Sequence, residues 1–257
     1  MNTLANRLYS HYLMPSRLTE YESLLQLAQQ AGYTQLSVRA FFRSLAGAPP
    51  VKAIVHRHDI DSDLRTTRKL FALEARYGVT ASYYFRLSTL DYGLMREIEA
   101  YGSEASYHYE EVADFAKANH LKKAADVRRR FPEIRMAFLQ NFEAIQDKLG
   151  LKLSTVASHG DFVNRRLKVI NHELLRDRDF RARCGIECES YDAELLREFD
   201  LYISDRPHPQ YYHPLSPFAA LGRHKRICLL THPVQWETNW LENTRCSVRR
   251  IVEELTW

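Results

Sequence analysis

The sequence predicts an α/β fold in which a parallel sheet or barrel is covered by helices. Two observations predict this class. Short runs of β-forming residues alternate with amphipathic helical stretches, an order that implies parallel strands joined by crossovers. The chain also has 257 residues with 45% hydrophobic composition, which is enough for one large core. We expect a single domain, with a helical lead-in over residues 1–50 packed on a barrel over residues 51–257.

The lead-in is predicted to be helical. LTEYESLLQLAQQAG (18–32) repeats apolar residues at helical spacing before a glycine, and SVRAFFRSL (37–45) is also amphipathic. The apolar run in VKAIVHRHDID (51–61) predicts the first strand. We expect Ser62 to cap the helix that follows, with Asp63 in its first turn.

The next elements continue the alternation. VTASYYFRL (79–87) is rich in β-formers and predicts a second strand, and DYGLMREIEAYG (91–102) predicts a helix closed by glycine. SEASYHYE (103–110) predicts the end of a third strand. The stretch that follows, up to Gly150, has helical periodicity.

The last third of the chain repeats the pattern. LSTVASHG (153–160), LYISD (201–205) and KRICLLTHP (225–233) predict strands. DAELLREF (192–199) predicts a helix, and NTRCSVRRIVEEL (243–255) predicts the closing one. Two segments remain unassigned, the polar stretch 162–190 and the loop RPHPQYYHPLSP.

Composition limits the classes of function. Lys plus Arg exceed Asp plus Glu by 36 − 32 = 4, and the basic residues are scattered, which disfavours nucleic-acid binding. The four cysteines lack the density of a disulfide framework, and Cys184 and Cys188 have no second pair with which to build a structural zinc site. No export signal or membrane span is recognisable, so we expect a cytoplasmic protein.

Polar residues unusual for a core follow the predicted strands. Each stands at a carboxyl end: Asp59, Asp61, His108, His159, Asp205 and His232. In a parallel barrel these ends share one rim, where active sites are built. Taken singly, an Asp-x-Asp pair is commonly a helix cap and a buried histidine commonly a hydrogen-bonded core residue. Their joint placement predicts a metal or acid–base site.

Two aspartates at alternate positions indicate the chemistry of this site. Asp59 and Asp61 project from the same face of a strand, where two bare carboxylates repel each other. A site of carboxylate and imidazole without thiolate suits zinc or a similar divalent ion. One aspartate would bind the ion, while the other stays ionised and takes a proton from the bound water.

Several motifs resemble those of the polysaccharide deacetylases of the NodB-homology group, the family-four carbohydrate esterases, and in particular cytoplasmic relatives with an RHDxD motif. The resemblance extends from Val51 to Trp240 and is carried by RHDID, SYYFRL, SEASYHYE, YISD and LLTHP. It implies a distorted, incomplete (β/α) barrel. It also implies hydrolysis of an N-acyl group on an amino sugar by metal-bound water.

The resemblance assigns roles by position. Asp59 resembles the catalytic base, Asp61 and His108 resemble metal ligands, and His232 resembles the acid that protonates the leaving amine. Where the family has a second metal histidine, this chain has Val112. We therefore expect His159 as the third ligand, with Glu110 or Glu111 as the next candidates. The Arg-Pro-Tyr-Gly type of run found in the family is absent.

Three further residues are candidates for substrate binding: Arg86, Asp205 and Trp236. Arg86, like Arg57, is predicted to bind an anionic part of the substrate, although an ion pair between a rim arginine and Asp205 is the plainer interpretation. Trp236 is predicted to stack on a sugar ring, and burial beside a core strand is the competing interpretation.

The predicted function is hydrolysis by a metal-dependent N-deacylase, with zinc as the expected ion. Its substrate would be an acetylated or formylated amino-sugar intermediate of bacterial surface polysaccharide (O-antigen or capsule) synthesis, carried on a nucleotide or a lipid. The competing hypothesis is a catalytically degenerate deacetylase fold that binds a glycan or a partner. The missing second histidine favours that hypothesis, whereas the retained aspartates and histidines count against it.

Overall fold

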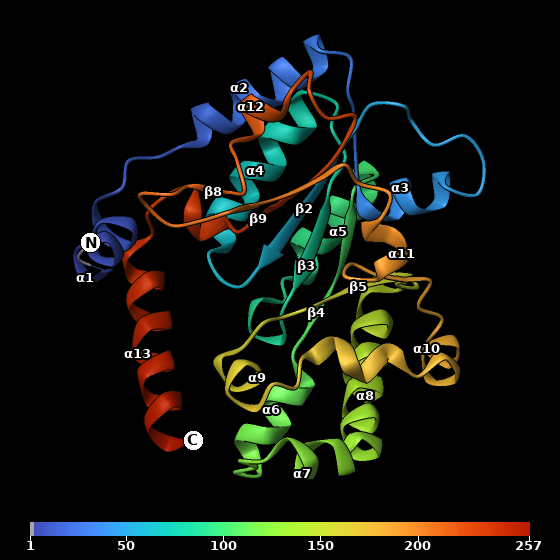
Figure 1. Ribbon diagram of the computed structural model, residues 1–257, viewed down its shortest axis with the longest axis vertical. Coiled ribbons are helices and arrows are strands. Elements are labelled where there is room, and N and C mark those ends of the chain that lie inside the picture. Colours follow the sequence, from blue (N-terminus) through green and yellow to red (C-terminus); the bar gives the residue numbers. More distant parts are fainter. Residues whose placement is uncertain (1–2) are drawn as a thin grey trace.

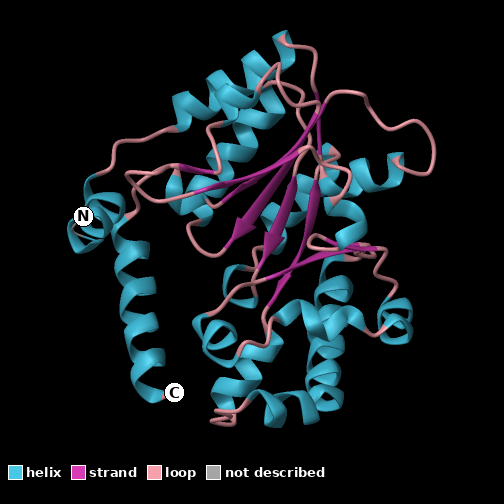
Figure 2. Cartoon of the chain, in the orientation of Figure 1, coloured by secondary structure: helices cyan, strands magenta, loops and turns pink. Residues whose placement is uncertain are grey.

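A curled, mostly parallel sheet forms the centre of the computed structural model, which describes residues 3–257 (Figure 1). The sheet has nine strands in the order β6-β5-β4-β3-β2-β9-β7-β8, and β1 pairs with β2 outside this path. Every pair is parallel except β7 with β8. Figure 2 shows the sheet curving between layers of helices without closing. The predicted α/β class is confirmed, and the sheet is compatible with an incomplete barrel.

The strands are two to eight residues long. Six were predicted from the sequence, and β1, β6 and β8, of two or three residues each, were not. Their bounds are β1 Thr34–Leu36, β2 Ala53–Ile60, β3 Ser82–Phe85, β4 Glu104–Tyr109, β5 Thr155–Ser158, β6 Cys188–Glu189, β7 Leu201–Asp205, β8 Tyr212–His213 and β9 Arg226–Thr231.

Helices precede the first strand, lie in most connections between strands and follow the last strand. They are α1 Thr3–Leu8, η1 Tyr9–Leu13, α2 Leu18–Gln30, α3 Val38–Ser44, α4 Leu64–Arg76, η2 Leu87–Thr89, α5 Tyr92–Tyr101, α6 Glu111–Ala118, α7 Ala124–Arg129, α8 Phe131–Leu149, α9 Phe162–Leu167, η3 Asn171–Arg176, α10 Arg178–Cys184, α11 Ala193–Leu196, α12 Pro217–Ala220, η4 Pro233–Gln235 and α13 Trp240–Thr256. Within residues 3–257, none combines the length and the apolar character needed to cross a bilayer.

Two local predictions need correction. The helical stretch before Gly150 is three helices, because His120 adopts a positive φ of 49° after α6 and Pro132 stands in the first turn of α8. The cap of α4 is Asp63, not Ser62. Its backbone is left-handed, with a φ of 57°, and its carboxylate accepts the amide of Thr66 at 3.3 Å.

Strand β2 is the central strand that carries the aspartate motif. On one edge, β1 pairs with Ala53–Val55 and β3 pairs with Arg57–Ile60, while β9 covers the other edge. The lead-in expected to be helical therefore also contributes a strand. Because side chains alternate along β2, His56 and His58 face α2 and α4, and Arg57 and Asp59 face the inside of the curl.

Most of the apolar core lies on the outer face of the sheet. Tyr83, Tyr107 and Phe138 are buried there under the helices. The inner face is partly polar: Glu104 accepts hydrogen bonds from Ser82 and Thr155. Buried polar groups need hydrogen-bond partners, and here the partners come from neighbouring strands. These bonds therefore link β3, β4 and β5.

Candidate metal centre

The carboxyl ends of the parallel strands bring distant residues together. Asp61 directly follows β2, His108 lies in β4, and His159 directly follows β5. On the other side of β2, His232 follows β9 and Asp205 ends β7. The predicted common rim is therefore present, although the sheet that supplies it is open.

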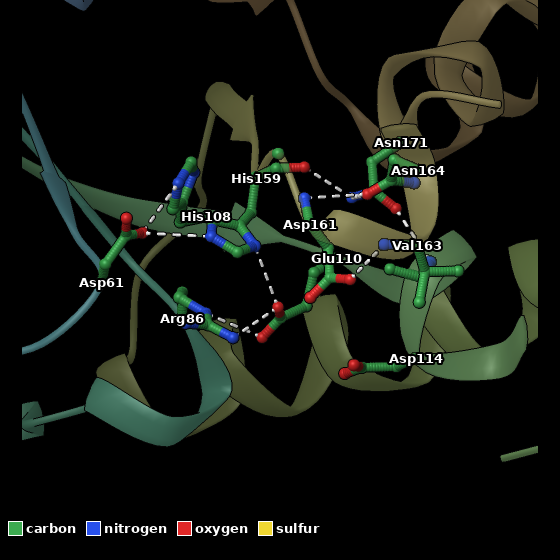
Figure 3. A network of polar contacts seen from close by, with 12 residues as sticks. Asp61, Arg86, His108, Glu110, Asp114, His159, Asp161, Val163, Asn164 and Asn171 are labelled. Atoms are coloured by element: carbon green, nitrogen blue, oxygen red, sulfur yellow. Dashed lines mark hydrogen bonds and ion pairs between the residues drawn. The ribbon is translucent and has the colours of Figure 1, made fainter. Parts of the chain in front are cut away.

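Three of these residues converge on one point. Asp61 Oδ1 lies 3.3 Å from His108 Nε2 and 3.6 Å from His159 Nε2 (Figure 3). In a tetrahedral zinc site with bonds of about 2.0–2.1 Å, neighbouring ligand atoms are about 3.3–3.4 Å apart. Both distances are close to this spacing, and the ligand atoms of all three side chains lie within 4.8 Å of one another, so the group could hold a divalent cation.

The Oδ1 atom of Asp61 is a second sign of a cation site. Its Oδ1 atom is buried, and no hydrogen bond from any residue of 3–257 reaches it. Burial alone would raise the pKa of Asp61, but the charges of His159 and His108 hold it well below its ordinary value. A buried, ionised oxygen without a hydrogen bond is the type of group that a bound cation satisfies.

The far ring nitrogens of both histidines are also engaged. His108 Nδ1 lies 2.9 Å from the carbonyl oxygen of Ala157. Because a carbonyl only accepts, Nδ1 carries a proton, so in the neutral imidazole Nε2 offers its lone pair toward Asp61. His159 Nδ1 forms an ion-pair contact with Glu110 Oε2 at 3.0 Å. Such outer contacts orient imidazoles that bind metals.

Glu110 is in turn held by Arg86. The guanidinium donates to both carboxylate oxygens, at 2.9 and 2.6 Å. Burial would raise the pKa of Glu110, but His159 and Arg86 lower it below its ordinary value. The predicted pairing of Arg86 with Asp205 is wrong: Arg86 positions Glu110, and Glu110 contacts the side of His159 away from Asp61.

Glu111 and Val112, which follow Glu110 in the chain, lie away from the centre. Glu111 accepts hydrogen bonds from Tyr107 and Asn141, and burial raises its pKa to about 7. Val112 is fully buried in the outer apolar core. Glu110 and Asp161 also approach His159 as a possible ligand group, but Asp161 already caps α9.

Asp59 is tied to a neighbour that sequence reasoning did not assign to it. Arg57 donates two hydrogen bonds of 2.8 Å to its carboxylate, and both side chains are buried. Asp59 Oδ2 also lies 3.4 Å from His108 Nε2. Burial would raise the pKa of Asp59, but Arg57 and His108 lower it, so the group is ionised. The signal was available, because residues two apart on a strand share a face.

His232 is paired with Asp205. Its Nδ1 lies 2.7 Å from Asp205 Oδ1, and its backbone amide donates to Oδ2 at 2.6 Å. Burial would lower the pKa of His232, but Asp205, helped by Asp61 and Asp59, raises it to about 9. Asp205 therefore orients the imidazole of His232 and favours its protonated form. Both of its carboxylate oxygens are used for this, so Asp205 does not present its carboxylate to a substrate.

Trp236 is not available for stacking on a sugar. It is fully buried, its indole N–H donates to Asp205 at 3.1 Å, and its ring packs against Tyr21 and Arg17. The prediction of Trp236 as a substrate-binding residue is therefore wrong. Its packing fixes Asp205, and through Asp205 it fixes His232.

A cavity of about 430 Å³ opens beside the centre and is lined by Asp61, Arg86 and His159. Helix α13 lines it too, through residues that include Arg249 and Glu253. The sequence does not indicate that α13 lies at the site, since nothing in a terminal amphipathic helix shows where it packs.

No family model matches the chain, and a search of curated proteins also finds no significant match.

Proposed function

We propose that the chain is a metal-dependent N-deacylase that hydrolyses the amide of an acylated amino sugar. One observation carries the proposal: the buried Asp61 Oδ1 faces the Nε2 atoms of His108 and His159, while the far nitrogen of each ring contacts another group. Two aspartate-linked groups, Asp59 with Arg57 and His232 with Asp205, stand beside this set.

The three ligand residues would hold the ion, with zinc as the expected one. When bound, a divalent ion polarises the acyl carbonyl and lowers the pKa of a water molecule. Asp59, ionised beside Arg57, would accept a proton from the water that adds to the acyl carbon. The bond between that carbon and nitrogen then breaks. His232, protonated through Asp205, gives the departing nitrogen its proton. The products are a carboxylic acid and a free amine.

The substrate class rests on the resemblance to NodB-type deacetylases and on the size of the site. A cavity of about 430 Å³ lies in the range of small-ligand sites. Under this proposal the sheet is the distorted barrel of that family. The sugar intermediate of surface polysaccharide synthesis is the pathway that the resemblance implies.

Metal analysis of protein purified without added ions tests the proposal. We expect about one zinc per chain, lost in Asp61→Ala and in His108→Ala. His172→Ala is the matched control, because His172, Glu189 and Asp192 form a separate group of possible ligands. Absence of metal under every loading condition, or loss in the control alone, would contradict it. Release of acetate or formate from N-acyl amino sugars then tests the reaction.

The competing function is a glycan-binding fold without catalysis. Val112, buried where the family has a metal histidine, favours it. Against it, His159 supplies a third ligand from a different strand end, so the centre does not need a side chain at that position. A zinc-loaded protein that releases neither acetate nor formate would support the glycan-binding function.

A further inference from the structure

The cavity beside the candidate metal centre is lined by more basic than acidic side chains. Outside the centre and its Arg86, five arginines face it, and they come from helices α1, α9 and α13: Arg7, Arg165, Arg245, Arg249 and Arg250. The acidic side chains that accompany them are Asp161, Glu242 and Glu253, which leaves an excess of 5 − 3 = 2 positive charges. The cavity therefore favours an anionic ligand.

Not all of the lining arginines are neutralised by the lining carboxylates. Asp161 and Glu253 each lie 3.3 Å from Lys117, so these two carboxylates are shared with a further cation. Arg165 contacts the carbonyl oxygen of Gly160 at 3.2 Å, and within residues 3–257 no carboxylate reaches its guanidinium. At least one lining arginine can therefore bind an anion without breaking an ion pair.

Helix α13 has an orientation that apolar burial does not explain. Its cavity side carries Arg245, Arg249 and Arg250, whereas its apolar residues are 47% to 81% exposed: Leu241, Val248, Ile251, Val252 and Leu255. A surface helix normally turns its apolar stripe inward. In Figure 1, α13 runs down one side of the molecule from η1 toward the C-terminus.

Polar contacts hold α13 in this orientation at both ends. Near its start, Asn243 donates to the carbonyl oxygen of His11 at 2.7 Å, and Asn239 donates to Asp63 at 2.8 Å. After its end, Trp257 donates to the carbonyl oxygen of Ala116 at 3.2 Å. The basic face is thus fixed beside the site by contacts that do not involve its arginines.

We propose that this arginine-lined part of the cavity binds the phosphoryl group of the substrate. The inference rests on the proposed function: the acyl amide lies at Asp61, His108 and His159, and phosphate oxygens lie against arginines of α9 and α13. Arginine suits this role because its planar guanidinium binds phosphate through two parallel hydrogen bonds. The substrate is therefore a phosphate or diphosphate ester of an acylated amino sugar, rather than an uncharged polysaccharide.

Calorimetric titration with three probes tests the inference: inorganic pyrophosphate, uridine diphosphate and farnesyl diphosphate. Each is titrated into the zinc-loaded protein and into chelator-treated protein, because phosphate bound by the ion itself disappears on chelation. We expect binding that survives chelation and weakens by about tenfold or more in Arg165→Gln/Arg249→Gln/Arg250→Gln. Arg129→Gln, on the exposed helix α7, is the matched control and should bind as the wild type does.

The probes also identify the source of the phosphate. Stronger binding of uridine diphosphate than of pyrophosphate supports a nucleotide carrier, and stronger binding of farnesyl diphosphate supports a lipid carrier. Binding of pyrophosphate alone, no binding of any probe, or equal binding by the triple variant and the wild type overturns the inference. If the protein binds phosphate but never takes up zinc, the proposed function is contradicted. The arginine-lined phosphate site is then still supported.

Discussion

Glu110 contacts His159 on the ring nitrogen opposite the one that faces Asp61, with Oε2 3.0 Å from Nδ1. The same carboxylate receives two hydrogen bonds from Arg86. A chain of three side chains therefore sets the orientation of one predicted metal ligand. Outer groups of this kind raise the basicity of the imidazole and fix its rotation.

This relationship predicts the effect of Glu110→Gln. The amide cannot carry the negative charge that favours His159 as a ligand, so zinc affinity should fall by about 10- to 100-fold. Competition with a metal chelator measures it. Glu111→Gln is the control, because Glu111 bonds to Tyr107 and Asn141, away from the centre. Equal zinc affinity in both variants would contradict the positioning role.

Arg57 and Asp59 form a deeply buried ion pair beside the site. Arg57→Met leaves the Asp59 carboxylate buried without its partner, so the free energy of unfolding should fall by about 3–5 kcal/mol. Urea denaturation measures this loss. Arg57→Met combined with Asp59→Leu should recover much of the stability, because no charge then remains unpaired. A double variant no more stable than Arg57→Met would argue against the pair.

The pKa of His232 predicts how its charge depends on pH. Asp205 raises this pKa to about 9, so the imidazolium is the main form at neutral pH and is lost as the pH rises through about 9. Asp205→Asn removes the charge that favours the imidazolium, so the titration should move to lower pH. Nuclear magnetic resonance of the ring protons follows it. His172, which pairs with Glu189, should titrate as before.

Trp236 and Trp240 should respond differently to truncation. Trp236 is fully buried beside Tyr21, so Trp236→Ala should lower the free energy of unfolding by about 3–5 kcal/mol. Trp240 is 66% exposed, and Trp240→Ala should change stability by no more than about 0.5 kcal/mol. Thermal and urea unfolding compare them. A stable Trp236→Ala protein would mean that the indole does not fix Asp205.

Much of the fold was predictable because its signals are local. The run from Val51 and the β-rich segment before Arg86 form strands, since apolar and aromatic periodicity depends on neighbours in the chain. The strands β6 and β8, of two residues each, carry no such periodicity and exist only through their pairing with β5 and β7. The cap of α4 is Asp63 and not the predicted Ser62, because the backbone of Asp63 is left-handed. The sequence did not indicate this turn.

The sequence by itself determined which polar residues end the strands, because alternation and strand order place Asp61, His108 and His159 at one rim. Only the tertiary structure decided the partner of each group: Asp205 for His232, Glu110 for His159, and the arginines of α13 for the cavity. The reason is physical. Which face a side chain takes depends on its own strand, whereas ion pairs and cavity walls depend on how separate elements pack.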